Sequence, residues 1–222
     1  MPPAARAAAA VVTVSAATAR RLRALLPEAD LILAPNGSDH LPASSPAPGC
    51  FLLAPGPWAR HKGLATLLAG WRLLGRNRPR LILTGRPGRR LPPGVEAVQP
   101  DDRGLSALLA GAAAVVRPSA FEGFDLPLAE ALAAGAPVAA SDIPVHRELA
   151  GEEAEWFQPG DDEGLATALD RILTTGDDPA ARLRRRRRAA RFRWAESARI
   201  LDQALRRLNL APPSGADSGS PV

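Results

Sequence analysis

The sequence predicts an α/β fold with a doubly wound parallel sheet of the Rossmann-like type. Short apolar runs recur along the chain, and none of them alternates apolar with polar residues. A strand that is apolar on both sides is covered on both faces, as in a parallel sheet between two layers of helices. Helical patterns separate the runs, and the order strand, helix, strand defines βαβ units.

Each element follows from its local pattern. The runs predicted to be strands are Val11–Ser15, Leu31–Pro35, Cys50–Pro55, Arg80–Gly85, Ala112–Val116 and Pro137–Ser141. The helical patterns between them are Ala16–Leu26, Lys62–Leu74, Gly104–Ala110, Pro127–Ala134 and Gly164–Thr174. A last helix is predicted from one apolar stripe, formed by Trp194, Ala198, Leu201, Leu205 and Leu208.

These elements divide the chain into five segments. Residues 1–40 supply one strand, one helix and one more strand, which is typical of the last βα unit of a preceding domain. A linker rich in Pro, Ala and Ser covers 41–49, and the main domain covers 50–175. Helices are predicted over 176–210, and the composition of 211–222 predicts a disordered tail.

The composition restricts the classes of function. The chain has 222 residues, a formal charge of +5 and 46% hydrophobic residues, enough for a packed core. One Cys excludes a disulfide framework and a multi-cysteine metal site. The apolar stretch Leu105–Val116 is too short to span a bilayer, and the first ten residues lack the apolar segment of a signal peptide. We therefore expect a cytoplasmic protein.

Candidate ligand-binding residues lie in the loops that follow the strands. Ligands of open α/β sheets bind at the carboxyl ends of the strands. The loop after the first strand of the main domain contains Gly56, Arg60 and Lys62, and the loop after the second strand contains Gly85. Lys62 is the only lysine among 28 basic residues, which suggests that its compact ammonium group is required there. An ordinary surface lysine is the alternative.

The loop 117–130 offers an anion site at the start of a helix. Pro127 suits the first helical turn, so the free backbone N–H groups of residues 123–126 point outward at the positive helix end. Glu130 could accept two hydrogen bonds from a ribose diol, and Glu122 is expected to face the same cleft from the other side of the anion. The alternative is that both carboxylates are merely solvated or complement the helix dipole.

The residues 118–130 read P-S-A-F-E-G-F-D-L-P-L-A-E. This stretch resembles the E-x7-E signature of retaining GT-B glycosyltransferases of family four, which usually read P-S-x-x-E-G-F-G-L-P-x-x-E. Further landmarks of the family are similar and occur in the same order: V-T-V-S, P-N-G-S-D, L-I-L-T-G, A-G-A-P-V-A-A-S-D-I-P and H-R-E-L-A-G. The resemblance covers roughly residues 10–208.

The resemblance implies the C-terminal, donor-binding half of a GT-B enzyme, with the N-terminal half largely missing. The donor would be a UDP- or GDP-linked sugar, and neither a cofactor nor a metal would be needed. Glu122 and Lys62 would be catalytic, Glu130 would bind the ribose, and the base would lie near Gly85 and Val98. The residues assigned to donor binding are Gly56, Arg60, Lys62, Gly85, Val98, Glu122, Gly123, Phe124, Asp125, Leu126 and Glu130.

Two departures from the family pattern leave alternatives open. Pro57 stands where an Arg is usual, and Arg60 is a possible substitute for that cation. Asp125 replaces a Gly, and its carboxylate either repels the diphosphate, turns away or binds a sugar hydroxyl. Because the N-terminal half with the acceptor contacts is also missing, a separate N-terminal domain chain is an expected partner. A catalytically inactive GT-B-like scaffold subunit is the alternative function.

An arginine run suggests other partners. It comprises Arg182, Arg184–Arg188, Arg191 and Arg193. Such a run favours an anionic membrane surface, which would place the protein at the inner face of a membrane. Nucleic acid is less favoured, because few aromatic residues accompany the run. A solvated helix face is the remaining interpretation.

Overall fold

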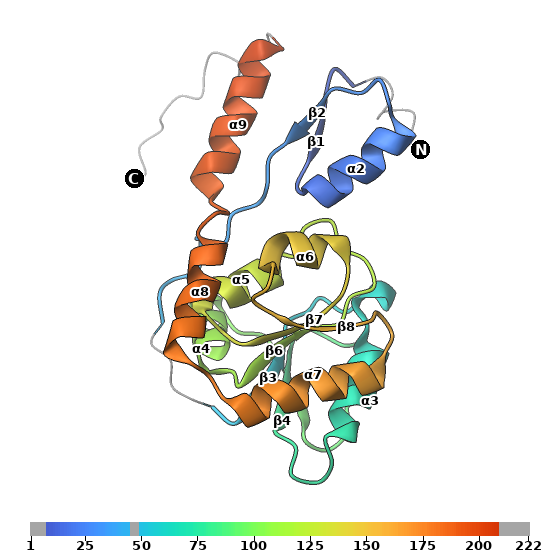
Figure 1. Cartoon of the computed structure of the whole chain (residues 1–222), viewed down its shortest axis with the longest axis vertical. Coiled ribbons are helices and arrows are strands. Elements are labelled where there is room, and N and C mark those ends of the chain that lie inside the picture. The colour runs from blue at the N-terminus through green and yellow to red at the C-terminus, as the bar shows by residue number, and fades with distance from the viewer. Residues whose placement is uncertain (1–7, 45–48, 209–222) are drawn as a thin grey trace, which may run out of the picture.

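The computed structural model describes residues 8–44 and 49–208, and it contains a six-stranded parallel sheet (Figure 1). The strands are β3 (Phe51–Ala54), β4 (Arg80–Thr84), β5 (Val95–Val98), β6 (Ala114–Arg117), β7 (Val138–Ser141) and β8 (Glu155–Phe157). Their order across the sheet is β5-β4-β3-β6-β7-β8, which is the doubly wound order of Rossmann folds. The predicted fold class is confirmed.

Helices cover both faces of this sheet (Figure 1). One layer consists of α3 (Leu64–Leu73) and α7 (Asp162–Thr175), which pack against each other. The opposite layer consists of α4 (Asp102–Gly111), α5 (Leu126–Ala134), α6 (Pro144–Ala150) and α8 (Pro179–Ala189). Strand β3 supplies both sides of the core, because Leu53 packs into one apolar cluster while Leu52 and Ala54 pack into the other. This double burial explains why the run is uniformly apolar.

A smaller unit precedes the main sheet. Strands β1 (Val11–Thr13) and β2 (Leu31–Leu33) pair in parallel, and α2 (Ala16–Leu25) connects them. The unit contacts α6, where the Glu148 carboxylate accepts hydrogen bonds from the first N–H groups of α2, those of Ala16 and Ala17, at 2.7 and 2.8 Å. A carboxylate at this position complements the positive end of the helix.

The last helix, α9 (Trp194–Arg207), lies beside β2 of the smaller unit (Figure 1). Its apolar stripe was predicted correctly as helical, but the stripe is not the buried face. Trp194 and Leu205 are exposed, whereas Ser197 is buried. Helix α9 thus returns from the main domain to the unit with which the described chain begins.

Three elements were not expected from the sequence. Strands β5 and β8 lie at the two edges of the sheet, and their short sequences V-E-A-V and E-W-F include charged residues. Edge strands need less apolar burial, so they lack the uniform run that identified the inner strands. Helix α6 has only 7 residues and therefore too little periodicity to detect. Part of the linker, 45–48, and the predicted disordered tail lie outside the described residues.

The arginine run lies largely on α8, and several of its side chains close the ends of other helices. Arg185 Nε donates to the Gly135 carbonyl at 2.8 Å, beyond the last turn of α5. Arg188 Nε donates to the Leu149 carbonyl at 2.8 Å in the last turn of α6. Cations at helix C-termini complement the helix dipole. These contacts give the run an internal structural role. Within the described ranges, no helix is long and apolar enough to cross a membrane.

We expect the replacement Arg185→Ala to lower the free energy of unfolding by about 1–3 kcal/mol, because it leaves the buried Gly135 carbonyl without its donor and removes one of two arginines from Asp177. The matched control is Arg187→Ala, which removes an exposed arginine of the same helix. It should change stability by no more than about 0.5 kcal/mol. Urea denaturation measures both, and equal losses would contradict a structural role for Arg185.

Candidate active site

The site forms where the strand order of the sheet reverses, between β3 and β6. The loops that follow these two strands lie in contact, because the Ala120 N–H donates to the His61 carbonyl at 2.8 Å. Gly63 has a φ of 69°, and a Cβ there would come within 2.1 Å of the Pro118 carbonyl oxygen. Only glycine permits this close approach, which brings Lys62 against the second loop.

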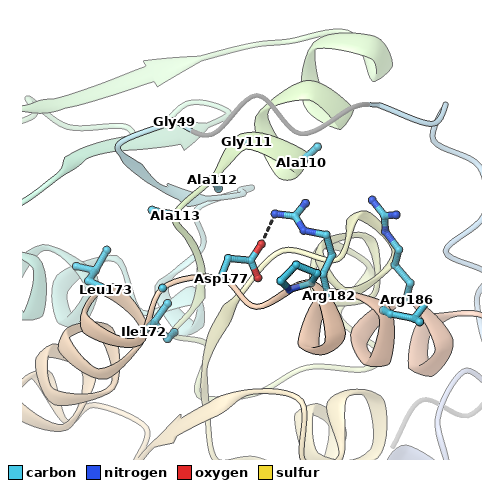
Figure 2. Close-up of a pocket in the computed structure, with 13 residues that line it drawn as sticks. Gly49, Ala110, Gly111, Ala112, Ala113, Ile172, Leu173, Asp177, Arg182 and Arg186 are labelled. Atoms are coloured by element: carbon cyan, nitrogen blue, oxygen red, sulfur yellow. Dashed lines mark hydrogen bonds and ion pairs between the residues drawn. The ribbon is translucent and has the colours of Figure 1, made fainter.

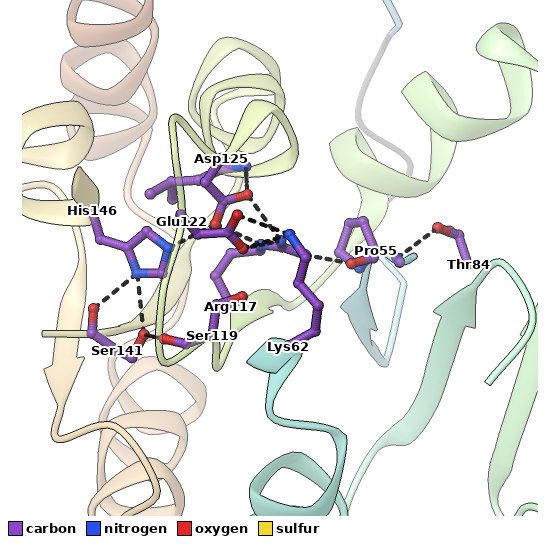
Figure 3. Close-up of polar contacts among 11 residues, drawn as sticks. Pro55, Lys62, Thr84, Arg117, Ser119, Glu122, Asp125, Ser141 and His146 are labelled. Atoms are coloured by element: carbon purple, nitrogen blue, oxygen red, sulfur yellow. Dashed lines mark hydrogen bonds and ion pairs between the residues drawn. The ribbon is translucent and has the colours of Figure 1, made fainter. Parts of the chain in front are cut away.

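Lys62 and Glu122 form an ion pair in this contact (Figure 3). The ammonium nitrogen Nζ lies 2.7 and 2.8 Å from the two carboxylate oxygens of Glu122. Arg117 Nη2 lies 3.6 Å from Glu122 Oε1 and adds a second cation to the same carboxylate. The two residues predicted to be catalytic are therefore brought together.

Arg117 is the centre of the site. It ends the apolar strand β6, and only 2% of its side chain is exposed. Its Nε donates to Asp125 Oδ2 at 3.0 Å, and its Nη2 lies 2.9 Å from Oδ1 of the same carboxylate. Its Nη1 donates to the Pro55 carbonyl at the end of the β3 strand. One guanidinium thus joins the ends of both strands at the reversal point.

Asp125 turns away from the solvent, which answers the question raised by its replacement of a motif glycine. Its φ of 72° lies in the left-handed region, where Asp is among the few tolerated side chains. Its carboxylate caps α5 by accepting from the Leu128 N–H at 3.3 Å. Burial alone raises the pKa of this carboxyl, but Arg117 and His146 outweigh burial and hold the pKa well below its usual range.

His146 on α6 completes the buried cluster (Figure 3). Its Nε2 lies 2.7 Å from Asp125 Oδ2, and its Nδ1 lies 2.9 Å from the carbonyl oxygen of Ser141 at the end of β7. The ring is completely buried. Five ionisable side chains therefore share one network. Lys62 comes from the turn before α3, Arg117 from the end of β6, Glu122 from the loop after β6, Asp125 from the start of α5 and His146 from α6.

The four amides predicted to bind an anion remain available. The N–H groups of residues 123–126 donate no hydrogen bond to any residue that the structure describes. A Cβ on Gly123 would meet only a methyl group of Val14, at 3.9 Å, so space is left beside this backbone. The Phe124 side chain packs in the core, 5.6 Å from the ring of Phe192, and the half-buried Leu126 side chain packs against the same core. At both positions the group that could contact an anion is therefore the backbone N–H.

The remaining donor-site residues gather at the carboxyl ends of β3, β4 and β5. The Gly85 N–H donates to the Val98 carbonyl at 2.9 Å. The Gly56 N–H donates to the Thr84 hydroxyl at 3.1 Å. Arg60 is exposed and forms no ion pair with the described residues. These positions form one continuous edge with Lys62.

Glu130 and Glu122 border different cavities. Glu130 borders one of about 450 Å³, and Glu122 borders another of about 260 Å³. The Nε2 atom of His40 lies 3.0 Å from Glu130 Oε1, so the carboxyl is paired with a residue next to the linker. Burial raises the pKa of Glu130, although His40 and Arg117 act against this rise.

A larger cavity of about 650 Å³ lies at the opposite edge of the sheet (Figure 2). Residues that precede β3 and β6 line it, together with the end of α7, and Arg182 pairs with Asp177 at its rim. None of the predicted site residues borders this cavity. The candidate site is therefore placed where the charged side chains meet, although this larger cavity lies elsewhere.

The cluster does not suit a metal ion, although the ligand atoms of Glu122, Asp125 and His146 lie within 4.8 Å of one another. Lys62 already neutralises Glu122, and Arg117 already binds both oxygens of Asp125. A cation added here would have to displace ammonium and guanidinium groups from buried carboxylates.

Sequence reasoning did not select Arg117 or His146 as site residues. The available signal for Arg117 was a charged residue that directly follows an apolar strand. His146 lies in H-R-E-L-A-G, which served only as a landmark. Neither signal reveals which carboxylate the side chain contacts.

The sheet order and the reversal-point site define a Rossmann-like domain of GT-B type. Residues 50–175 match the family described as "Glycosyl transferases group 1", which is more than half of the chain. The chain therefore belongs to this glycosyltransferase family.

Relatives of known name match parts of the chain. It is 36% identical over 120 residues to an MMP alpha-(1->4)-mannosyltransferase of Mycolicibacterium hassiacum, covering 48% of this chain and 28% of the relative. It is 44% identical over 95 residues to a glycogen synthase of Mycobacterium tuberculosis, covering 42% and 22%. The matched regions thus span less than a third of either relative.

A solved structure extends the likeness to nearly the whole chain. The sucrose-phosphate synthase of Thermosynechococcus elongatus aligns with a TM-score of 0.76 and 27% identity, covering 94% of this chain and 60% of that one. The chain therefore spans about three fifths of the solved relative.

The buried Asp125 should make stability depend on pH. Because the folded pKa is lowered, the folded chain releases this proton more readily than the unfolded chain, so stability is gained above about pH 4 and lost as pH falls below it. At pH 7, Asp125→Asn should cost about 3 kcal/mol or more, because it leaves Arg117 and His146 without their carboxylate. The difference from the unmodified protein should shrink toward pH 2, as urea denaturation at stepwise pH would show.

The control for this series is Asp170→Asn, which changes an exposed carboxylate without an ion pair to the described residues. Its stability curve should run parallel to that of the unmodified protein. A gap for Asp125→Asn that stays constant from pH 7 to pH 2 would contradict the assigned charge.

Proposed function

We propose that this chain is the donor-binding half of a retaining family-four glycosyltransferase, with a UDP- or GDP-linked sugar as the donor. The observation that supports it is the convergence of two loops at the reversal point of a doubly wound sheet. One carries the Lys62 ammonium, and the other carries the amides of residues 123–126, which donate to no described residue. Helix starts with free N–H groups bind phosphate, and a cation in the adjoining loop adds to this preference.

In this proposal each group has one task in sugar transfer. The Lys62 ammonium and the amides stabilise the charge that develops on the leaving diphosphate, so no metal or other cofactor is required. Glu122, as part of E-x7-E, accepts hydrogen bonds from the transferred sugar. Glu130 binds the ribose hydroxyls once its carboxyl has left His40, and Gly56, Gly85 and Val98 border the base.

The relatives support a hexosyl residue as the transferred group, because their names describe a mannosyltransferase and a glycogen synthase. Acceptor contacts come from a further domain, on the same chain or on a separate one, since the curated relatives are much longer than the matched regions. A cytoplasmic location, with peripheral membrane contact through the exposed arginines, completes the proposal.

Nucleotide binding tests the proposal directly. UDP or GDP should bind the purified chain, and Lys62→Ala should weaken binding by about tenfold or more, because a charge-assisted hydrogen bond is lost. Arg72→Ala is the matched control, since it removes a cation from the other end of α3. Isothermal titration calorimetry measures nucleotide binding to the unmodified chain and to both variants. Absence of binding by both nucleotides to the unmodified chain at millimolar concentration would refute the donor site.

The scaffold alternative rests on Pro57, which occupies the position of a family cation. It predicts no chemistry even when a donor binds. We expect slow hydrolysis of the matching nucleotide sugar, reduced about a hundredfold in Glu122→Gln, since one positioned polar group is commonly worth this factor. Chromatography of the released nucleotide measures the rate. Hydrolysis that is absent even after addition of an acceptor-binding domain would favour the scaffold.

A further inference from the structure

We propose that His146 is a buried imidazolium cation in the folded protein, and that it acts as a positioning residue for the anion-binding turn at the start of α5. The charge follows from the partners of its two ring nitrogens, each of which accepts a hydrogen bond and cannot donate one. The ligand of that turn, a nucleoside diphosphate, is taken from the function proposed above.

The nitrogen Nδ1 must carry a proton. It lies 2.9 Å from the Ser141 carbonyl oxygen, which is only an acceptor. The Ser141 hydroxyl, 3.2 Å from the same nitrogen, donates its own proton to the Ser119 carbonyl and can therefore only accept from the ring. Both neighbours of Nδ1 thus require an N–H group.

The nitrogen Nε2 must carry a proton as well. It lies 2.7 Å from Asp125 Oδ2, which also accepts from Arg117 Nε at 3.0 Å. The other oxygen, Oδ1, lies 2.9 Å from Arg117 Nη2 and accepts from the Leu128 N–H. A carboxylate held by a two-point guanidinium contact and a helix N-terminus is ionised, so the ring donates. Protons on both nitrogens make the ring a cation.

The cluster then contains more positive than negative charge. Lys62, Arg117 and the His146 ring supply three cations, whereas Glu122 and Asp125 supply two anions. These are the charged groups that face the ring from β6, the loop after β6, the start of α5 and the turn before α3. The neighbouring buried carboxylate of Glu130 is paired separately with His40. The surplus adjoins the start of α5, where the N–H groups of residues 123–126 donate to no described residue, so a bound diphosphate would complete the charge balance.

The ring also fixes the geometry of the turn. Asp125 has a left-handed backbone, which is costly for a residue other than glycine unless its side chain is held. His146 and Arg117 hold this side chain from two directions. The conformation that aims the amides outward therefore depends on the imidazolium, which need not touch the ligand.

The charge can be measured without any ligand. The chain contains only His40, His61 and His146, so nitrogen-15 spectra of the labelled full chain should give three ring systems. The replacements His40→Gln and His61→Gln assign two of them. At pH 7.5 the third ring should show an attached proton on both nitrogens, and a bare nitrogen on that ring would overturn the proposal.

The positioning role is measured with His146→Gln, whose amide can still donate to Asp125 but carries no charge. We expect UDP or GDP affinity to fall about tenfold, since a charge-assisted contact exceeds a neutral one by roughly that factor. Arg72→Ala, which removes one positive charge at the far end of the sheet, should leave affinity unchanged within about twofold.

The outcomes separate this proposal from the function on which it rests. Doubly protonated His146 without nucleotide binding to the unmodified chain would refute the donor site but leave the imidazolium standing. Unchanged affinity in a folded His146→Gln variant, judged by its melting temperature and circular dichroism, would refute the positioning role. Should that variant not fold, the ring spectrum of the unmodified chain still decides the charge.

Discussion

The buried ion pair between Arg117 and Asp125 is the interaction on which the site depends. It joins the end of β6 to the first turn of α5, and through the Pro55 carbonyl it also reaches the end of β3. A buried guanidinium and carboxylate are costly to desolvate, so their value lies in the geometry that they enforce. Here they fix a left-handed turn at the start of α5, beside the ion pair of Glu122 with Lys62.

The arginine-rich composition has two different uses in this fold. On α8, guanidinium groups close the carbonyl ends of α5 and α6, where a planar fork with several donors is suited to the task. At the site, the single lysine contributes a point charge that is paired with Glu122. The same layer of helices is therefore stabilised by arginines at the C-terminal ends of α5 and α6, while the N-terminal end of α5 borders the candidate site.

The sequence was sufficient to predict the inner strands, the helices between them and the convergence of the Lys62 loop with the loop 117–130, because each depends on local apolar pattern or on strand ends meeting at one edge. It was not sufficient for contacts that depend on side-chain direction. The contact of His146 with Asp125 and that of His40 with Glu130 join residues 21 and 90 positions apart, and the inward turn of Asp125 depends on the direction of the Arg117 side chain. The edge strands β5 and β8 were not predicted for another reason, since half-exposed strands need no apolar run.

The outer side of the anion-binding loop is tied to the smaller unit. The hydroxyl groups of Ser15 and Thr18 both donate to the Gly123 carbonyl, at 2.6 and 3.1 Å. That carbonyl belongs to the same peptide plane as the Phe124 N–H, so the orientation of this amide depends on where α2 lies against the loop. A displacement of the smaller unit would therefore rotate a backbone donor at the start of α5.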